Sequence, residues 1–233
     1  EITVRDWSSD VCSSDLAISV KDWMKANNIK GTIRFYGCPA EEGGSGKVYM
    51  VREGVFDDVD VALHWHPSSA NAASAGAALA NKSAKFRFYG ISAHAAAAPQ
   101  MGRSALDGVE AMNYMVNMMR EHVPEDARIH YVITEGGEAP NVVPDFAEVY
   151  YYARHNTRDV VVDIFDRMVK AAEGAALGTG TTMDYEMIGG THELLPNLTV
   201  QKVMYDNLVK VGGVTYNEEE KAFAEKISKS LGN

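Results

Sequence analysis

The stretch that decides the fold is residues 31–67, GTIRFYGCPAEEGGSGKVYMVREGVFDDVDVALHWHP. Its apolar runs at 32–36 and 59–65 predict two short strands, and the residues between them, about 46–53, predict a helix. Strand, helix and strand in this order form a βαβ unit of a parallel sheet covered by helices. Because an open α/β sheet carries its chemistry at the carboxyl ends of its strands, the acidic residues and histidines that end these two runs predict half of a metal site.

Two adjacent carboxylates, Glu41 and Glu42, follow the first predicted strand. In a metal-dependent hydrolase one carboxylate holds the ion while another takes a proton from the attacking water, and two consecutive residues on a tight turn can do both. The glycines that follow allow the backbone to pack closely. The alternative is an exposed acidic turn before a helix N-terminus, where the helix dipole favours carboxylates.

Histidines end the second predicted strand. His66 lies 24 residues after Glu42, and in a βαβ unit the two strand ends come side by side. Imidazole together with carboxylate suits zinc or manganese, so we predict that His66 is a metal ligand. His64 has the same facing parity in a strand. His64 is the less favoured metal ligand, or it lies next to the ligand His66 without binding the metal itself.

Composition limits the classes of partner. The chain has 233 residues with a net charge of -10, from 22 Lys+Arg against 32 Asp+Glu, and this balance argues against nucleic-acid and anionic-membrane partners. No apolar run approaches the roughly 20 residues of a membrane span, and the start of the chain lacks the pattern of a secretory signal. Two cysteines in unrelated contexts, Cys12 and Cys38, favour a reducing compartment, so we expect a cytoplasmic protein.

The chain divides into four segments. Residues 1–15, with their Ser/Asp repeat, we interpret as non-native or disordered. Residues 16–80 begin with a helical pattern at 16–28 and continue into the βαβ unit, which predicts part of a catalytic domain. Residues 191–233 return to helical patterns at 199–211 and 218–231, and we assign them to the same domain.

Residues 81–190 form a separate unit. An alternating strand, a helix with an apolar stripe, two strands, a second striped helix and a last strand follow one another, which is the βαββαβ order of ferredoxin-like domains. The methionines of this stripe suit irregular gaps in a core, and a methionine-lined ligand groove is the minor alternative. The fold class is therefore α/β, a partial parallel-sheet domain with an inserted ferredoxin-like lid or dimerisation domain.

Three motifs occur in order: GCPAEEGGSGKVYMVREGVFDDVDVALHWHP, GISAHAAAAPQMGRSALDGVE and EGGEAPNVVPDFAEVYYYAR. They resemble the dinuclear-metal amidohydrolases of the aminoacylase and carboxypeptidase type, closest to the p-aminobenzoyl-glutamate hydrolase branch. The resemblance runs from about residue 16 to the end of the sequence. It implies a hydrolase that cleaves the amide of an N-acyl amino acid, with two zinc or manganese ions in each full-length subunit.

The resemblance also implies roles for single residues. Glu41 matches the general base, and Glu42 and His66 match metal ligands. His94 matches a lid histidine that reaches across a dimer to stabilise an oxyanion, and Asn141 a lid asparagine used in the same way. Arg154 matches an arginine suited to a substrate carboxylate. Without the resemblance, each of these three would be read as a solvated lid residue.

Two of the family's metal-binding segments have no counterpart in this sequence. A Cys-Gly-His type motif is expected before residue 16 and a histidine ligand after residue 233, and His192 lies outside the expected motif. We therefore expect a fragment that is inactive alone. Its parent is expected to act on a small N-acyl amino acid as a homodimer or as a heterodimer with a related subunit.

Two alternatives remain open. One is a related hydrolase of the same fold that acts on another N-acyl amino acid or a peptide. The other is a non-catalytic dimerisation or regulatory subunit.

Overall fold

The computed structural model describes residues 7–41, 43–66, 68, 70–74, 76 and 78–231. The elements are, in order, α1 Trp7–Ala26, α2 Gly46–Arg52, β1 Ala80–Tyr89, η1 Pro99–Met101, α3 Ala105–Met119, η2 Arg120–His122, β2 Arg128–Glu135, β3 Phe146–His155, α4 Arg158–Thr179, β4 Thr182–Thr191, α5 Leu198–Val211 and α6 Glu218–Ser230.

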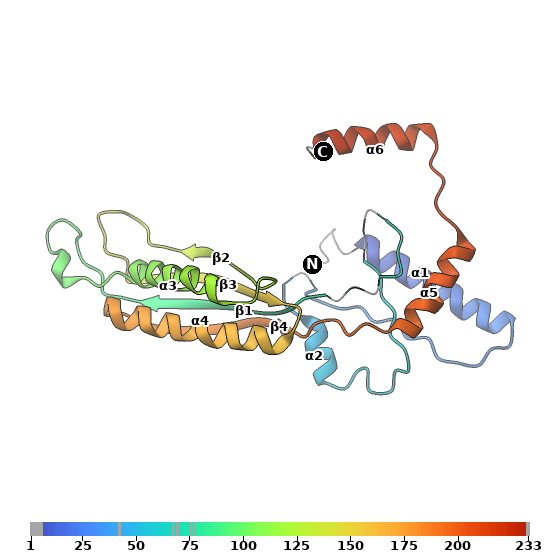
Figure 1. Cartoon of the computed structure of the whole chain (residues 1–233), viewed down its shortest axis with the longest axis horizontal. Coiled ribbons are helices and arrows are strands. Elements are labelled where there is room, and N and C mark those ends of the chain that lie inside the picture. The colour runs from blue at the N-terminus through green and yellow to red at the C-terminus, as the bar shows by residue number, and fades with distance from the viewer. Residues whose placement is uncertain are drawn as a thin grey trace.

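The strands of the described residues form a four-stranded sheet with the strand order β2-β3-β1-β4. All three pairs of neighbouring strands are antiparallel, with Phe86 of β1 opposite Val149 of β3 and Tyr185 of β4. The predicted order of strand and helix over residues 81–190 is present in the structure. Both helices of this unit, α3 and α4, run alongside the sheet (Figure 1).

The core lies between one face of the sheet and these two helices. Period-two alternation turns one set of strand residues toward the helices, and the helices meet it with an apolar stripe. Met112 of α3 and Met168 of α4 are fully buried, so the prediction that methionines fill the core is confirmed for them. The other fully buried large side chains of the described residues are Phe86, Phe88, Val109, Val116, Ile129, Val149, Tyr151, Val161, Ile164 and Phe165.

Local sequence explains where the two core helices start and stop. The Ser104 hydroxyl accepts a hydrogen bond from the Asp107 N–H at 3.2 Å and caps α3. Gly180, with φ of 67°, ends α4 in the left-handed conformation that glycine adopts without strain. Gly108 faces Phe88 so closely that an added Cβ would lie 2.5 Å from its ring. Glycine at this position therefore sets how near α3 comes to β1.

The segments outside the sheet differ from the prediction in two ways. The first helix, predicted at residues 16–28, is α1 and begins at Trp7. The strands predicted at 32–36 and 59–65 are wrong for this structure, because neither segment forms a strand. A parallel strand is stabilised by neighbours on its edges, and the apolar runs have no such partner among the described residues.

Side chains hold these two segments together instead. Arg34 donates to both carboxylate oxygens of Asp58, and Tyr36 packs edge-on against Phe56 with ring centroids 4.7 Å apart. The Tyr36 hydroxyl also donates to the Val55 carbonyl at 3.1 Å. The segments before and after α2 therefore lie side by side, as the βαβ prediction required, although no strand forms.

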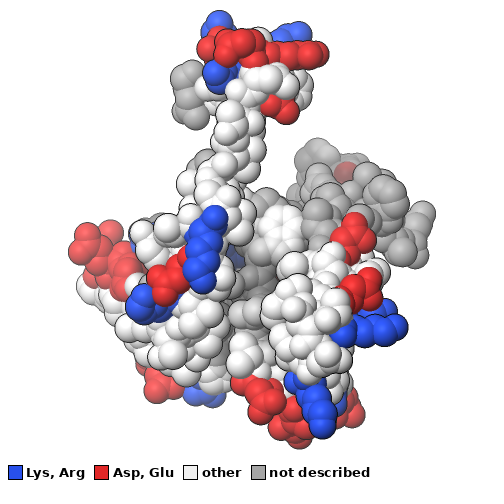
Figure 2. All heavy atoms as spheres, turned by 90° about the vertical axis from the view of Figure 1, so that its right-hand side faces the viewer, with Lys and Arg blue, Asp and Glu red and all other residues white. Residues whose placement is uncertain are grey.

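Residues after β4 form the two predicted helices. Asn197 caps α5, and Asn217 and Glu220 form a reciprocal capping box at the start of α6. α6 stands apart from the rest of the chain at the end of an extended connection (Figure 1), and its surface mixes acidic and basic side chains (Figure 2).

No described helix combines the length and the apolar character needed to cross a membrane. The predicted domain boundaries stay predictions.

Candidate functional site

Glu41 lies in the tight turn that leads into α2, with its side chain exposed. The turn is as close-packed as its glycines predicted, because a Cβ on Gly46 would lie 1.9 Å from the Pro39 carbonyl oxygen and one on Gly44 would lie 2.5 Å from the Ala40 Cβ. Glu42 falls outside the described residues. The local geometry therefore supports a close-packed acidic turn, of which the structure describes one carboxylate.

His64 and His66 lie on the exposed, irregular segment that precedes residue 67. Within the described ranges, no three His, Cys, Asp or Glu side chains come close enough to hold a metal ion together. Glu42 lies outside those ranges, so the predicted trio of Glu41, Glu42 and His66 stays a prediction. The described donor set does not by itself fit a metal.

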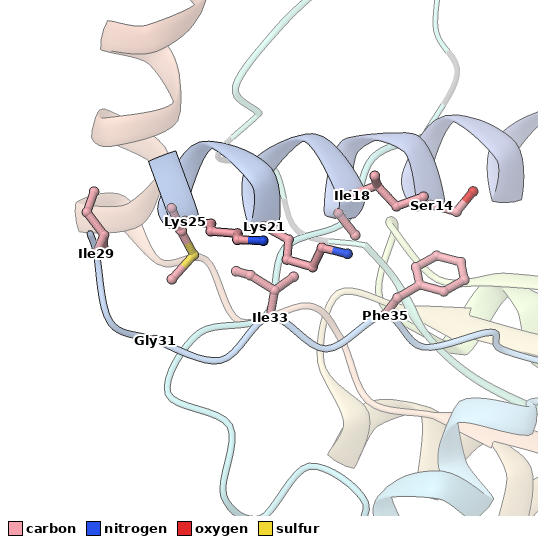
Figure 3. Close-up of a pocket in the computed structure, with 10 residues that line it drawn as sticks. Ser14, Ile18, Lys21, Lys25, Ile29, Gly31, Ile33 and Phe35 are labelled. Atoms are coloured by element: carbon pink, nitrogen blue, oxygen red, sulfur yellow. The ribbon is translucent and has the colours of Figure 1, made fainter. Parts of the chain in front are cut away.

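A hollow of about 510 Å³ lies elsewhere, between α1 and residues 29–35 (Figure 3). Its wall is mainly apolar, with Ile18, Ile33 and Phe35 on it, and its charged members are Lys21 and Lys25. None of the predicted catalytic or metal-binding residues lines it. Without a carboxylate or histidine in its wall, this hollow offers no acid, base or metal ligand for hydrolysis.

His94 and Asn141 are brought together. The loop after β1 and the loop before β3 pair through a backbone bridge between His94 and Val142, and the Ala95 N–H donates to the Asn141 carbonyl at 3.0 Å. The His94 Nδ1 accepts hydrogen bonds from the N–H groups of Ala96 and Ala97 at 3.2 and 3.1 Å. A neutral imidazole that accepts at Nδ1 carries its proton on Nε2, which leaves an N–H donor on an exposed ring.

Arg154 lies at the opposite end of the sheet. It is the ninth residue of β3, whereas Asn141 precedes the start of that strand at Phe146. At about 3.3 Å per residue, the eight steps from Phe146 to Arg154 alone span on the order of 26 Å. The guanidinium of Arg154 lies 5.1 Å from the centre of the Tyr152 ring. One copy of the chain therefore cannot bring His94, Asn141 and Arg154 to the same small molecule.

The face of the sheet turned away from α3 and α4 carries a charged network that the sequence did not predict. The buried Glu148 carboxylate accepts from Lys85 Nζ at 2.9 Å, Arg87 Nε at 2.9 Å and Thr134 Oγ1 at 2.8 Å. Arg87 also donates to Glu186. Burial acts to raise the Glu148 pKa, but the hydrogen bonds outweigh it and lower that pKa to about 2.

Sequence alternation could have placed Lys85, Arg87 and Glu148 on a polar face, but not beside one another. Their contact depends on the register of β1 against β3, which pairs Arg87 with Glu148. Arg87 and Glu148 are 61 residues apart in the chain, so no local pattern in the sequence reports their pairing. The network neutralises its own charges, so it is a structural feature of the sheet.

Known proteins resemble this chain in both sequence and structure. Residues 80–179 match the peptidase dimerisation domain. The chain is 50% identical to a p-aminobenzoyl-glutamate hydrolase subunit of Escherichia coli over 92% of its own length and 45% of the relative. It is 31% identical to the Xaa-Arg dipeptidase of Mus musculus over 84% of its own length and 46% of the relative.

A solved structure gives the same picture. The aminobenzoyl-glutamate utilization protein of Klebsiella pneumoniae superposes with a TM-score of 0.60 at 25% identity, covering 76% of this chain and 46% of that one. The chain thus spans about half the length of the relatives it matches. Residues 80–179 match a peptidase dimerisation domain, and most of the chain is similar to amidohydrolases and peptidases.

Proposed function

We propose that this chain is part of a metal-dependent amidohydrolase that cleaves the amide bond of an N-acyl amino acid of the p-aminobenzoyl-glutamate type. The observation that carries the proposal is the 50% identity to a p-aminobenzoyl-glutamate hydrolase subunit across 92% of the chain. The close-packed acidic turn at Glu41 supports it, because a hydrolase needs a positioned carboxylate to move a proton.

Glu41 is the general base in this proposal. Its exposed carboxylate would accept a proton from the attacking water and pass it to the nitrogen of the leaving amine, which must be protonated before it departs. A divalent zinc or manganese ion, held by Glu42 and His66, would supply Lewis acidity toward the carbonyl. His94 would stabilise the developing negative charge on the carbonyl oxygen through its Nε2–H.

The ferredoxin-like lid is proposed to act across a dimer. The loop after β1, which carries His94, and the loop before β3, which carries Asn141, lie at the end of the sheet away from α2 (Figure 1), and we propose that they act on the site of a partner. One of the two edges of the sheet is β2, where Tyr131, Val132 and Ile133 are 38%, 55% and 41% exposed. An exposed apolar edge strand is a template for pairing with a second chain.

The catalytic proposal is tested in a chimera in which residues 16–233 replace the matching region of the Escherichia coli relative. With zinc or manganese present, the chimera is expected to release p-aminobenzoate. Glu41→Gln should lower kcat by about 10²- to 10⁴-fold, the range for loss of a general base, while Glu53→Gln, an exposed carboxylate after α2, should leave it unchanged. Near-normal turnover in Glu41→Gln would sink the assignment.

The dimer is tested on this chain by analytical ultracentrifugation. We expect a self-associating species that Val132→Lys converts to a monomer, because a buried lysine at the pairing edge is uncompensated. Leu177→Lys, at a site 86% exposed near the end of α4, is the matched control and should not change the mass. A chain that stays monomeric at high concentration points instead to pairing with a related subunit, and a Val132→Lys dimer contradicts the β2 edge.

A further inference from the structure

Two arginines are cross-strand neighbours on the open side of the sheet. Arg128, the first residue of β2, is the direct cross-strand partner of Arg154 on β3. Both side chains are exposed and lie on the same face, because directly paired residues point the same way. Like charges directly opposite each other destabilise a strand pair. The arrangement therefore needs a reason other than stability of the sheet.

Neither guanidinium is neutralised by the part of the chain that the structure describes. No carboxylate lies within ion-pair distance of Arg128 or Arg154 there. Asp126, close to Arg128 in the chain, is engaged elsewhere, since its oxygens accept from His155 Nε2 at 2.8 Å and from Asn156. Farther along the same face, Arg87 has Glu148 and Glu186. This face therefore carries a neutralised group of charges around Arg87 and, farther along, the two cations Arg128 and Arg154.

The donors of Arg128 are oriented. Its Nη1 donates to the carbonyls of Glu125 and Ala127 at 2.8 and 2.7 Å, which uses both hydrogens of that nitrogen. The Nε–H and Nη2–H groups have no partner among the described residues, and together they form the edge of a guanidinium that binds a carboxylate bidentately. Within the same described ranges Arg154 keeps its N–H donors, because its contact with Tyr152 is through the ring face.

We propose that Arg128 is a specificity-determining residue and that, with Arg154, it forms a site for ligands with two carboxylates. Each guanidinium would take one carboxylate, since paired Cβ atoms about 4.5–5.5 Å apart allow two forks to converge on one small molecule. The identification of the ligand as an acyl-glutamate rests on the proposed function. The two-carboxylate preference rests on the paired arginines alone.

The test measures by NMR, at low ionic strength, how tightly this chain binds glutarate, a dicarboxylate, and butyrate, a monocarboxylate. We expect glutarate to bind at least about fivefold more tightly than butyrate and to shift the Nε–H resonances of both arginines. Arg128→Gln should remove that preference while butyrate affinity changes little. Arg128→Lys, which keeps the charge and loses the fork, should be intermediate.

The control is Arg52→Gln at the end of α2, which should bind glutarate like the parent chain. Folding of every variant is checked from the dispersion of its amide spectrum. Equal affinity for the two ligands in the parent chain, or unchanged glutarate affinity in a folded Arg128→Gln, would overturn the proposal. Because no catalysis is measured, an inactive chimera leaves this result standing, and loss of the preference leaves the hydrolase proposal standing.

Discussion

Replacing Glu148 by glutamine should destabilise the sheet, because it removes the negative charge that Lys85 and Arg87 share. The carboxylate is 8% exposed and is the shared acceptor of Lys85, Arg87 and Thr134. Its pKa falls from 4.5 in the unfolded chain to about 2 in the folded protein, which corresponds to about 3 kcal/mol of stability at pH 7. The lysine and arginine side chains are about a third exposed, so solvent screening reduces the expected loss to about 2–3 kcal/mol.

The sign of the pH dependence follows from the depressed pKa. Glu148 contributes its full stabilisation above the unfolded pKa of 4.5 and loses it as the pH falls toward the folded pKa of about 2. The free energies of unfolding of the parent chain and Glu148→Gln should therefore differ most above pH 5. The difference should shrink steadily below pH 4.

Urea unfolding followed by far-UV circular dichroism at pH 7 and pH 3 measures both quantities. Glu186→Gln is the matched control, because that carboxylate is 55% exposed and, among the residues that the structure describes, forms an ion pair with Arg87 alone. Its expected cost is below about 1 kcal/mol at either pH. If Glu148→Gln costs no more than Glu186→Gln at pH 7, or costs the same at pH 3 as at pH 7, the account of the network is refuted.

Two further substitutions test the packing of the core by urea unfolding. Gly108→Ala gains about 1 kcal/mol of helix propensity, but its Cβ would lie 2.5 Å from the buried Phe88 ring. We therefore expect a net destabilisation of about 1–2 kcal/mol. A more stable variant would contradict the close approach of α3 to β1. Asn113→Ala removes the acceptor of the buried Tyr151 hydroxyl and should cost about 1–3 kcal/mol, of which Tyr151→Phe in the same chain should restore part; no restoration would mean that the loss is a cavity effect.

Much of the dimerisation domain was predictable because its signals are local. The alternation around Phe86 and the apolar stripe on α3 each concern residues within one element, and the cap at Ser104 acts within one turn. The same local rule failed at residues 32–36 and 59–65. Apolar runs of strand length make a strand only when another backbone pairs with them, and pairing is not visible within the run.

The site residues also differ in whether local signals or the tertiary structure reveal their positions. Glu41, Glu42 and His66 were chosen from residue type and spacing, and the close-packed turn around Glu41 agrees with its glycines. Arg154 and Asn141 are separated by 13 residues in the sequence, yet the extended β3 strand carries them to opposite ends of the sheet. Spacing along the chain does not report on direction in space, so their separation came only from the structure.

The sequence by itself determined which residues could be acids, bases or ligands, and which segments of the dimerisation domain would be helix or strand. The tertiary structure decided that the loops of His94 and Asn141 pair, that Glu148 is shared by two cations, and that Arg128 and Arg154 are cross-strand partners. The physical reason is range. Propensity and capping act over a few residues, whereas each of these contacts joins two separate segments of the chain, and those within the sheet depend on strand register.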